Sequence, residues 1–250
     1  MLQVEPLDIR ISGGDGRSLV EAVSFQVEEG SVACLIGPSG CGKSSVIKWI
    51  AGILPDEMDA RGRLLVEGRT VDPRGGLVAA YQPQTDALFP WLTIRENVCL
   101  GLEIAGLPRA EAWRKAAPLF EPFGLNGTAH LFPRQLSGGM RQRAAFLRTI
   151  VQDRRYILLD EPFSALDAIT KLRMQEWLAA RLEADPRGVL MVTHDLHEAT
   201  RMADRVLVMA GRPGRIVADI PIPFPRHRRS ETALAPLREE LKALLLEDKT

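Results

Sequence analysis

Two spacings of apolar residues divide the chain. Apolar and polar residues alternate over 7–11 and again over 23–27, which predicts two strands with one buried face each. Shorter, nearly continuous apolar runs lie at 32–36, 63–67, 77–81, 156–159, 189–193, 206–209 and 216–220. Continuous apolar strands that alternate with helical segments are typical of a parallel sheet covered on both faces. The pattern therefore predicts an α/β fold.

The middle of the chain has a different pattern. Between about residues 86 and 155 the apolar spacing is helical, and no convincing strand is present. Residues 93–96 have the spacing of a capping box, 108–120 predict an amphipathic helix, and 136–151 predict another. We therefore expect a helical insertion in the α/β core.

The last part of the chain begins with a proline-rich stretch over 221–225. Four basic residues follow at 226–229, and we expect a solvated turn there rather than a lipid-binding patch. Beyond them, 232–247 carries leucines at helical spacing, which predicts a helix that packs on the chain's own core.

The strongest chemical signal is a glycine-rich loop between the apolar run 32–36 and a helical pattern. Its spacing, G-x-x-x-x-G-K-[ST], is that of the phosphate-binding P-loop. Glycines let a phosphate approach the main chain, the loop amides point at the anion, Lys43 supplies a positive charge for the β- and γ-phosphates, and the Ser44 hydroxyl can ligate Mg²⁺. The predicted nucleotide-binding residues are Gly37, Pro38, Ser39, Gly40, Cys41, Gly42, Lys43, Ser44 and Ser45.

A second signal is the apolar strand 156–159, which ends in two acids, Asp160 and Glu161. A carboxylate at the carboxyl end of a strand beside a P-loop is placed to hold Mg²⁺, so Asp160 is the predicted metal ligand together with Ser44. Glu161 points elsewhere and is the predicted base, which polarises a water for in-line attack on the γ-phosphate.

A third signal is the stretch Leu136–Arg143, in which Ser137, Gly138 and Gly139 open a helix and form a second anion site. With this stretch, the chain resembles the ATPase subunit of an ABC transporter, whose signature sequence is L-S-G-G-x-x-Q-R. The resemblance covers about residues 4–220. It counts against a metabolic P-loop kinase, the alternative that a P-loop alone leaves open.

The resemblance implies a fold: a RecA-like P-loop NTPase core with a parallel sheet and an N-terminal antiparallel β subdomain. The core is expected over about 4–85 and 156–220, the helical subdomain over about 86–155, and a tail with a helix over 221–250.

The resemblance also implies further site residues. Ser164–Asp167 matches the D-loop, with Asp167 at the nucleotide, and His194 matches the switch histidine, which contacts the γ-phosphate and holds the attacking water with Glu161. The Q-loop glutamine usually stands six residues before a proline, which selects Gln84 as a ligand of Mg²⁺ and water. Gln82, which follows an aromatic residue, stays open as the alternative.

The implied function is that of the ATP-hydrolysing subunit of an importer. The implied cofactors are ATP and Mg²⁺, and the implied partners are a second copy of the chain, integral membrane permease subunits and, indirectly, a solute-binding protein. The place of action is the cytoplasmic face of the membrane. Phe89–Thr93 and Asp160–Asp167 look most like the nitrate, sulfonate and taurine importers. An ABC ATPase acting on nucleic acid or ribosomes is the rival hypothesis.

One departure from the family concerns the base. ABC ATPases usually place an aromatic residue near the first strand to stack on adenine, whereas this chain offers only Ile11 for apolar contact.

Composition adds little to these motifs. Lys and Arg number 32, equal to Asp and Glu at 32, so no net charge favours nucleic acid or anionic lipid as a partner. Cys34, Cys41 and Cys99 lack C-x-x-C spacing, so neither a disulfide framework nor a zinc site is expected, and a reducing cytosol is the default. No apolar run approaches the length of a membrane-spanning helix.

Overall fold

A six-stranded sheet organises the chain, in the order β10-β9-β3-β8-β7-β6. The computed structural model describes residues 1–12, 16–76 and 78–247. All neighbouring pairs are parallel except β10 with β9. The strands are β3 (Val32–Ile36), β6 (Ala80–Gln82), β7 (Tyr156–Asp160), β8 (Gly188–Val192), β9 (Arg205–Ala210) and β10 (Arg215–Pro221).

Every residue of β3, β7 and β8 is buried, which explains their unbroken apolar sequences. The edge strands differ from the prediction. The run 77–81 forms a strand only from Ala80, and it extends to Gln82, while Leu77 lies outside the described residues. In β10 half-buried and exposed residues alternate because one face of this edge strand meets solvent.

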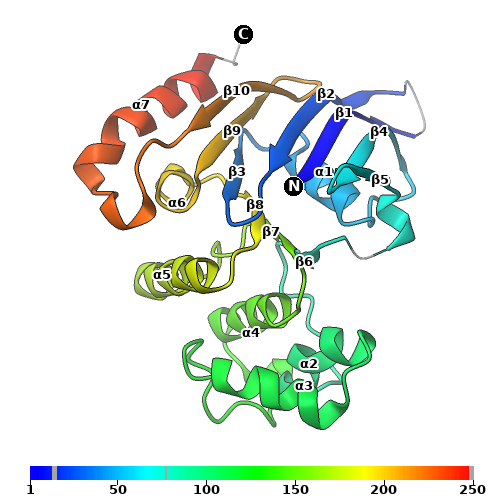
Figure 1. Cartoon of the computed structure of the whole chain (residues 1–250), viewed down its shortest axis with the longest axis vertical. Coiled ribbons are helices and arrows are strands. Elements are labelled where there is room, and N and C mark those ends of the chain that lie inside the picture. The colour runs from blue at the N-terminus through cyan, green and yellow to red at the C-terminus, as the bar shows by residue number, and fades with distance from the viewer. Residues whose placement is uncertain (13–15, 77, 248–250) are drawn as a thin grey trace.

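A four-stranded antiparallel sheet, in the order β2-β1-β4-β5, packs against one side of this core. Its strands are β1 (Leu2–Ile11), β2 (Ser18–Val27), β4 (Met58–Val66) and β5 (Arg69–Val71). Its inward side chains share one hydrophobic core with α1 (Lys43–Ile50) and with one face of the larger sheet. The predicted antiparallel subdomain is confirmed, and Figure 1 shows it beside α1.

The helical subdomain lies at the bottom of Figure 1 and consists of α2 (Ile94–Ile104), α3 (Arg109–Ala116) and α4 (Gly138–Ile150). The predicted capping box opens α2: Thr93 Oγ1 accepts from the amide of Glu96, and the Glu96 carboxylate accepts from the amide of Thr93. The predicted helix over 108–120 is α3, continued by a 3₁₀ turn at Ala117–Leu119.

The other face of the large sheet is covered by α5 (Ala168–Ala184), α6 (Leu196–Met202) and α7 (Glu231–Glu247), and a second core joins these helices to the helical subdomain. Short 3₁₀ turns lie at Pro73–Gly75, Pro133–Gln135 and Arg226–Arg228. None of the helices in the described part of the chain has the length and apolar character needed to cross a membrane.

The C-terminal segment is tied to the core by two arginines. Arg229, with a side chain only 1% exposed, donates to the carbonyl oxygens of Thr200 and Arg201 at the end of α6. Arg226 and Arg229 both pair with Asp204. The expectation of a solvated basic turn is therefore wrong for these two residues, because they cap α6 and hold the tail. The predicted packing of α7 is confirmed by its buried leucines, Leu234 and Leu241.

We expect Arg229→Met to lower the free energy of unfolding by about 2 to 3 kcal/mol, because two carbonyls and Asp204 lose a buried charged donor. Urea unfolding measures the change. Arg228→Met is the matched control: its side chain is exposed, and its effect should stay within about 0.5 kcal/mol. Equal losses in the two variants would contradict the anchoring role.

Candidate functional site

The glycine loop joins β3 to α1 and is pressed against neighbouring main chain. Gly40 and Gly42 have φ angles of +84° and +100°, in the left-handed region that favours glycine. A Cβ on Gly37 would lie 2.1 Å from the Met209 carbonyl oxygen, and one on Gly42 would lie 2.5 Å from Val20 Cγ2. Glycine is therefore required at Gly37 and Gly42 by this chain's own packing.

Lys43 begins α1, and its side chain folds back over the loop. Its Nζ donates to the carbonyl oxygens of Gly37 and Pro38, both at 2.8 Å. The ammonium group is thus held where a phosphate on the loop would meet it. Cys41 is buried with its Sγ 3.7 Å from the Met209 carbonyl oxygen, and burial raises the pKa of its thiol. The Cys41 thiol is thus directed at the main chain of β9, and Cys41 is not among the residues that line the pocket over this loop.

A pocket of about 290 Å³ opens over this loop. Its lining residues are Leu19, Ser39, Gly40, Gly42, Lys43, Ser44, Ser45, Gln84 and Glu161. The pocket thus gathers six of the predicted loop residues with a glutamine and an acid that are far away in sequence. Leu19, on β2, was missed by sequence reasoning because it looks like any other apolar strand residue. Ile11, the apolar candidate for contact with the base, is not among the lining residues.

Two oxygen donors meet beside the pocket. Ser44 Oγ donates to Asp160 Oδ1 at 3.2 Å. Asp160 is the last residue of β7 and is 2% exposed, and this burial raises the pKa of its carboxyl. A hydroxyl and a carboxylate are oxygen ligands of the kind that Mg²⁺ prefers, and phosphate oxygens complete such sites. The donor set therefore fits Mg²⁺, and a cation would offset the burial of Asp160.

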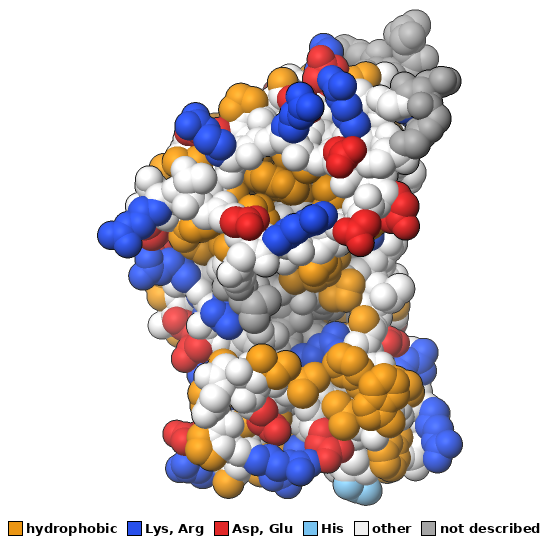
Figure 2. Space-filling view, turned by 90° about the vertical axis from the view of Figure 1, so that its right-hand side faces the viewer, with side chains coloured by type: hydrophobic (Ala, Val, Ile, Leu, Met, Phe, Trp, Pro, Cys, Tyr) orange, Lys and Arg blue, Asp and Glu red, His pale blue; other side chains and the backbone are white. Residues whose placement is uncertain are grey.

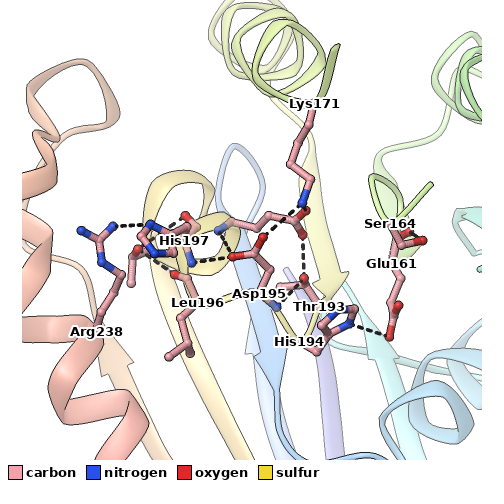
Figure 3. Close-up of polar contacts among 11 residues, drawn as sticks. Glu161, Ser164, Lys171, Thr193, His194, Asp195, Leu196, His197 and Arg238 are labelled. Carbon is pink, nitrogen blue, oxygen red and sulfur yellow. Dashed lines mark hydrogen bonds and ion pairs between the residues drawn. The ribbon is translucent and has the colours of Figure 1, made fainter. Parts of the chain in front are cut away.

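The carboxylate of Glu161 is held from two sides. Gln84 Nε2 donates to Glu161 Oε2 at 3.3 Å. His194 Nδ1 lies 3.2 Å from Glu161 Oε1 (Figure 3). Glu161 has a φ of +49°, unusual for a residue other than glycine, and its amide donates to the Val192 carbonyl at 2.9 Å. The turn after β7 thus aims Glu161 at the pocket while Asp160 stays buried.

The two glutamines lie in different places. Gln84 lines the pocket, whereas Gln82 is 0% exposed in β6, and its side-chain amide has no hydrogen-bond partner among the described residues. Side chains on a strand point alternately to the two faces of the sheet, so the direction of Gln82 is set by β6. Gln84 lies beyond the end of β6 and is not bound by this alternation. The geometry therefore favours Gln84 over Gln82 as the glutamine of the site.

The remaining predicted residues lie elsewhere. Among the described residues, the lining of the pocket includes none of Ser137, Gly138, Gly139 or Asp167. Ser137 caps α4 and accepts from the amide of Met140 at 3.3 Å. A Cβ on Gly138 or Gly139 would meet nothing closer than 3.8 Å. Asp167 caps α5 and is exposed. The signature stretch is therefore an open helix start, separate from the phosphate pocket of the same chain.

Together, the phosphate loop, the buried lysine, the strand-end carboxylates and the parallel sheet define a P-loop nucleotide-binding ATPase. Residues 20–164 match the model of the ABC transporter family. Through that match and the relatives below, the chain belongs to the ABC transporter family and is one of its ATP-hydrolysing, ATP-binding subunits.

Several relatives cover nearly the whole chain. It is 39% identical to "Formylaminopyrimidine import ATP-binding protein ThiZ" of Halalkalibacterium halodurans, over 92% of this chain and 91% of that protein. It is 42% identical to "Aliphatic sulfonates import ATP-binding protein SsuB 2" of Burkholderia lata, over 94% and 84%. It is 38% identical to "Taurine import ATP-binding protein TauB" of Rhizobium johnstonii, over 98% and 96%.

The fold is also that of solved ATP-binding cassettes. The dimeric post-hydrolysis structure of MJ0796 bound to ADP and Pi matches with a TM-score of 0.78 at 25% identity, over 90% of this chain and 100% of that chain. The α/β, RecA-like fold expected from the sequence is confirmed, as is the family.

Glu161→Gln tests the predicted base. The amide keeps the shape of the side chain but cannot take a proton, so we expect turnover to fall at least about 100-fold while ATP affinity changes less than about threefold. Phosphate release and nucleotide titration measure the two quantities. Glu121→Gln, at an exposed acid of the helical subdomain, is the matched control. Turnover of Glu161→Gln within about threefold of wild type would remove Glu161 as the base.

Proposed function

We propose that this chain is the ATP-binding subunit of an importer of small solutes of the nitrate, sulfonate or taurine kind. Two copies bind two ATP between them, and hydrolysis drives a separate permease at the cytoplasmic face of the membrane, with a solute-binding protein acting indirectly. The three relatives named above are all import ATP-binding proteins, which supports the importer assignment. Mg²⁺ bound by Ser44, Asp160 and Gln84 would neutralise charge that develops on the phosphates.

The proposed dimer is supported by one observation, the contrast between the glycines of the phosphate loop and those of the signature stretch. Gly37 and Gly42 are required by contacts inside this chain, whereas a Cβ on Gly138 or Gly139 would make only ordinary van der Waals contacts, and neither residue has a positive φ. An exposed helix start whose first two residues are glycines suits an anion that approaches from outside. A second copy, packed head to tail, would bring its phosphates there, and symmetry makes both sites composite.

The adenosine part of ATP needs an apolar wall. Leu19 lines the pocket beside Gly42, at the side where β2 meets the glycine loop. We assign Leu19, rather than Ile11, to contact with the nucleoside. An aliphatic side chain contacts any base through dispersion and has no hydrogen bond with which to select adenine.

Support for the permease contact comes from Phe89 and Trp91, which lie between Gln84 and α2. Trp91 is 69% exposed and Phe89 is 38% exposed, with their ring centroids 5.4 Å apart. The fully buried Asn97 binds both the amide and the carbonyl of Phe89, and Arg148 donates to the carbonyls of residues 86 and 87. A fixed aromatic pair on the surface is typical of a protein interface. Figure 2 shows further hydrophobic side chains gathered on the helical subdomain.

A mixed dimer tests the composite site. Lys43→Ala removes the phosphate cation, and Ser137→Arg fills the open helix start, so each variant alone should be inactive. In a mixed dimer one site carries both lesions and the other carries neither, so about a quarter to a half of wild-type turnover should return if sites act independently. Separate affinity tags isolate the mixed species. A mixed dimer that forms and stays inactive would count against independent composite sites.

Capture from membranes tests the transport partner. The tagged wild-type chain should copurify with an integral membrane protein, and Trp91→Ala should reduce the recovery at least about fivefold because the aromatic anchor is lost. Ile104→Ala, at an exposed apolar residue at the end of α2, is the control and should leave recovery unchanged. Recovery of RNA or ribosomes in place of a membrane protein would favour the rival hypothesis.

A further inference from the structure

The position of His194 depends on the main chain that carries it. About two thirds of its side chain is exposed, at 66%, and its ring reaches Glu161 from the loop after β8. The residues on either side are fixed instead. Thr193 is buried, and its Oγ1 donates to Glu198 Oε2 at 2.6 Å while accepting from the amide of Asp195 at 3.1 Å. The loop is therefore anchored through Asp195 and Glu198.

One cation holds both of these carboxylates. Lys171 Nζ lies 3.1 Å from Asp195 Oδ2 and 2.6 Å from Glu198 Oε1 (Figure 3). Within the part of the chain that the structure describes, neither carboxylate pairs with another cation. Burial by itself lowers the pKa of Lys171, but hydrogen bonds to Glu198 and Asp195 outweigh it and raise that pKa, so the lysine stays charged.

Lys171 belongs to a different element from the loop that it holds. It lies in the first turn of α5, where its amide donates to the carbonyl of Asp167 at 2.9 Å. Asp167 is the N-cap of that helix. Lys171 therefore connects the start of α5, which follows the turn of Glu161, with the loop that carries His194. His194 in turn contacts Glu161 Oε1.

We propose that Lys171 is a positioning residue for ATP hydrolysis, which keeps His194 in place against Glu161 by fixing Asp195 and Glu198 to α5. The inference rests on the proposed roles of Glu161 and His194. Glu198 is 4% exposed, so removal of the lysine leaves a buried carboxylate for which, among the described residues, Thr193 is the remaining side-chain donor. The loop would then shift or take up water, and small misplacements of a reacting group reduce rates steeply.

Lys171→Met tests the proposal, because it keeps most of the aliphatic stem and removes the charge. We expect kcat for ATP to fall at least about tenfold while KM changes less than about twofold, and Lys171→Arg to restore kcat to within about threefold of wild type. Lys115→Met is the matched control. Lys115 of α3 makes a 2.8 Å ion pair with Asp153, and neither residue is among those that line the pocket, so kcat should be unchanged.

A double-mutant cycle separates positioning from general damage. If Lys171 acts through His194, Lys171→Met should cost less than about twofold in a His194→Ala background. An equal loss in both backgrounds would make Lys171 merely structural and overturn the proposal. If Lys171→Met does not fold, the double variant Lys171→Met, Glu198→Gln removes the unpaired negative charge of Glu198 as well. Recovery of the fold with wild-type kcat would also overturn the proposal.

The outcomes distinguish this inference from the proposed function. Wild-type turnover in Glu161→Gln would refute the proposed base, and with it the premise of this inference. Loss of turnover in Glu161→Gln together with full turnover in Lys171→Met would refute the role of Lys171 alone.

Discussion

The site depends on close contact between the glycine loop and the strands around it. The Met209 carbonyl of β9 and Val20 of β2 leave no room for a Cβ on Gly37 or Gly42, and a Cβ on Gly214 would lie 1.9 Å from the carbonyl oxygen of Cys41. The loop is therefore wedged between the two sheets. This contact fixes the directions of the loop amides and places Leu19 in the wall of the pocket, so the antiparallel sheet contributes to a site that the parallel sheet creates.

The parallel sheet assembles the remaining site residues by bringing the ends of its strands together. The carboxyl ends of parallel strands meet at one edge, and β3, β7 and β8 deliver the phosphate loop, the Asp160–Glu161 pair and the His194 loop there. Asp160 stays buried beside Ser44, and the left-handed turn at Glu161 sends the next carboxylate to the pocket. Two adjacent acids thus have different surroundings, which suits one to a metal and the other to a water.

Much of this was predictable, because the motifs combine residue type with spacing. The core strands, the helical insertion and the loop from Gly37 to Ser44 are encoded locally, by periodicity and by chemistry that few other sequences satisfy. Leu19, Arg229 and Lys171 were not predictable, because their roles arise from contacts across long sequence separations. Lys171 meets Asp195 and Glu198 only after α5 and α6 have packed on the sheet. Gln82 and Gln84 likewise differ by position, because Gln82 is still in β6 whereas Gln84 lies beyond the strand and lines the pocket.

In the proposed dimer, one chain carries only half of each ATP site. Sedimentation of Glu161→Gln, which should bind ATP without consuming it, measures the assembly that such shared sites require. We predict a single species of about 27.6 kDa without nucleotide and a species of twice that mass at saturating ATP, with Ser137→Arg abolishing the shift. A Glu161→Gln chain that stays monomeric while nucleotide titration shows its pocket filled would contradict the account.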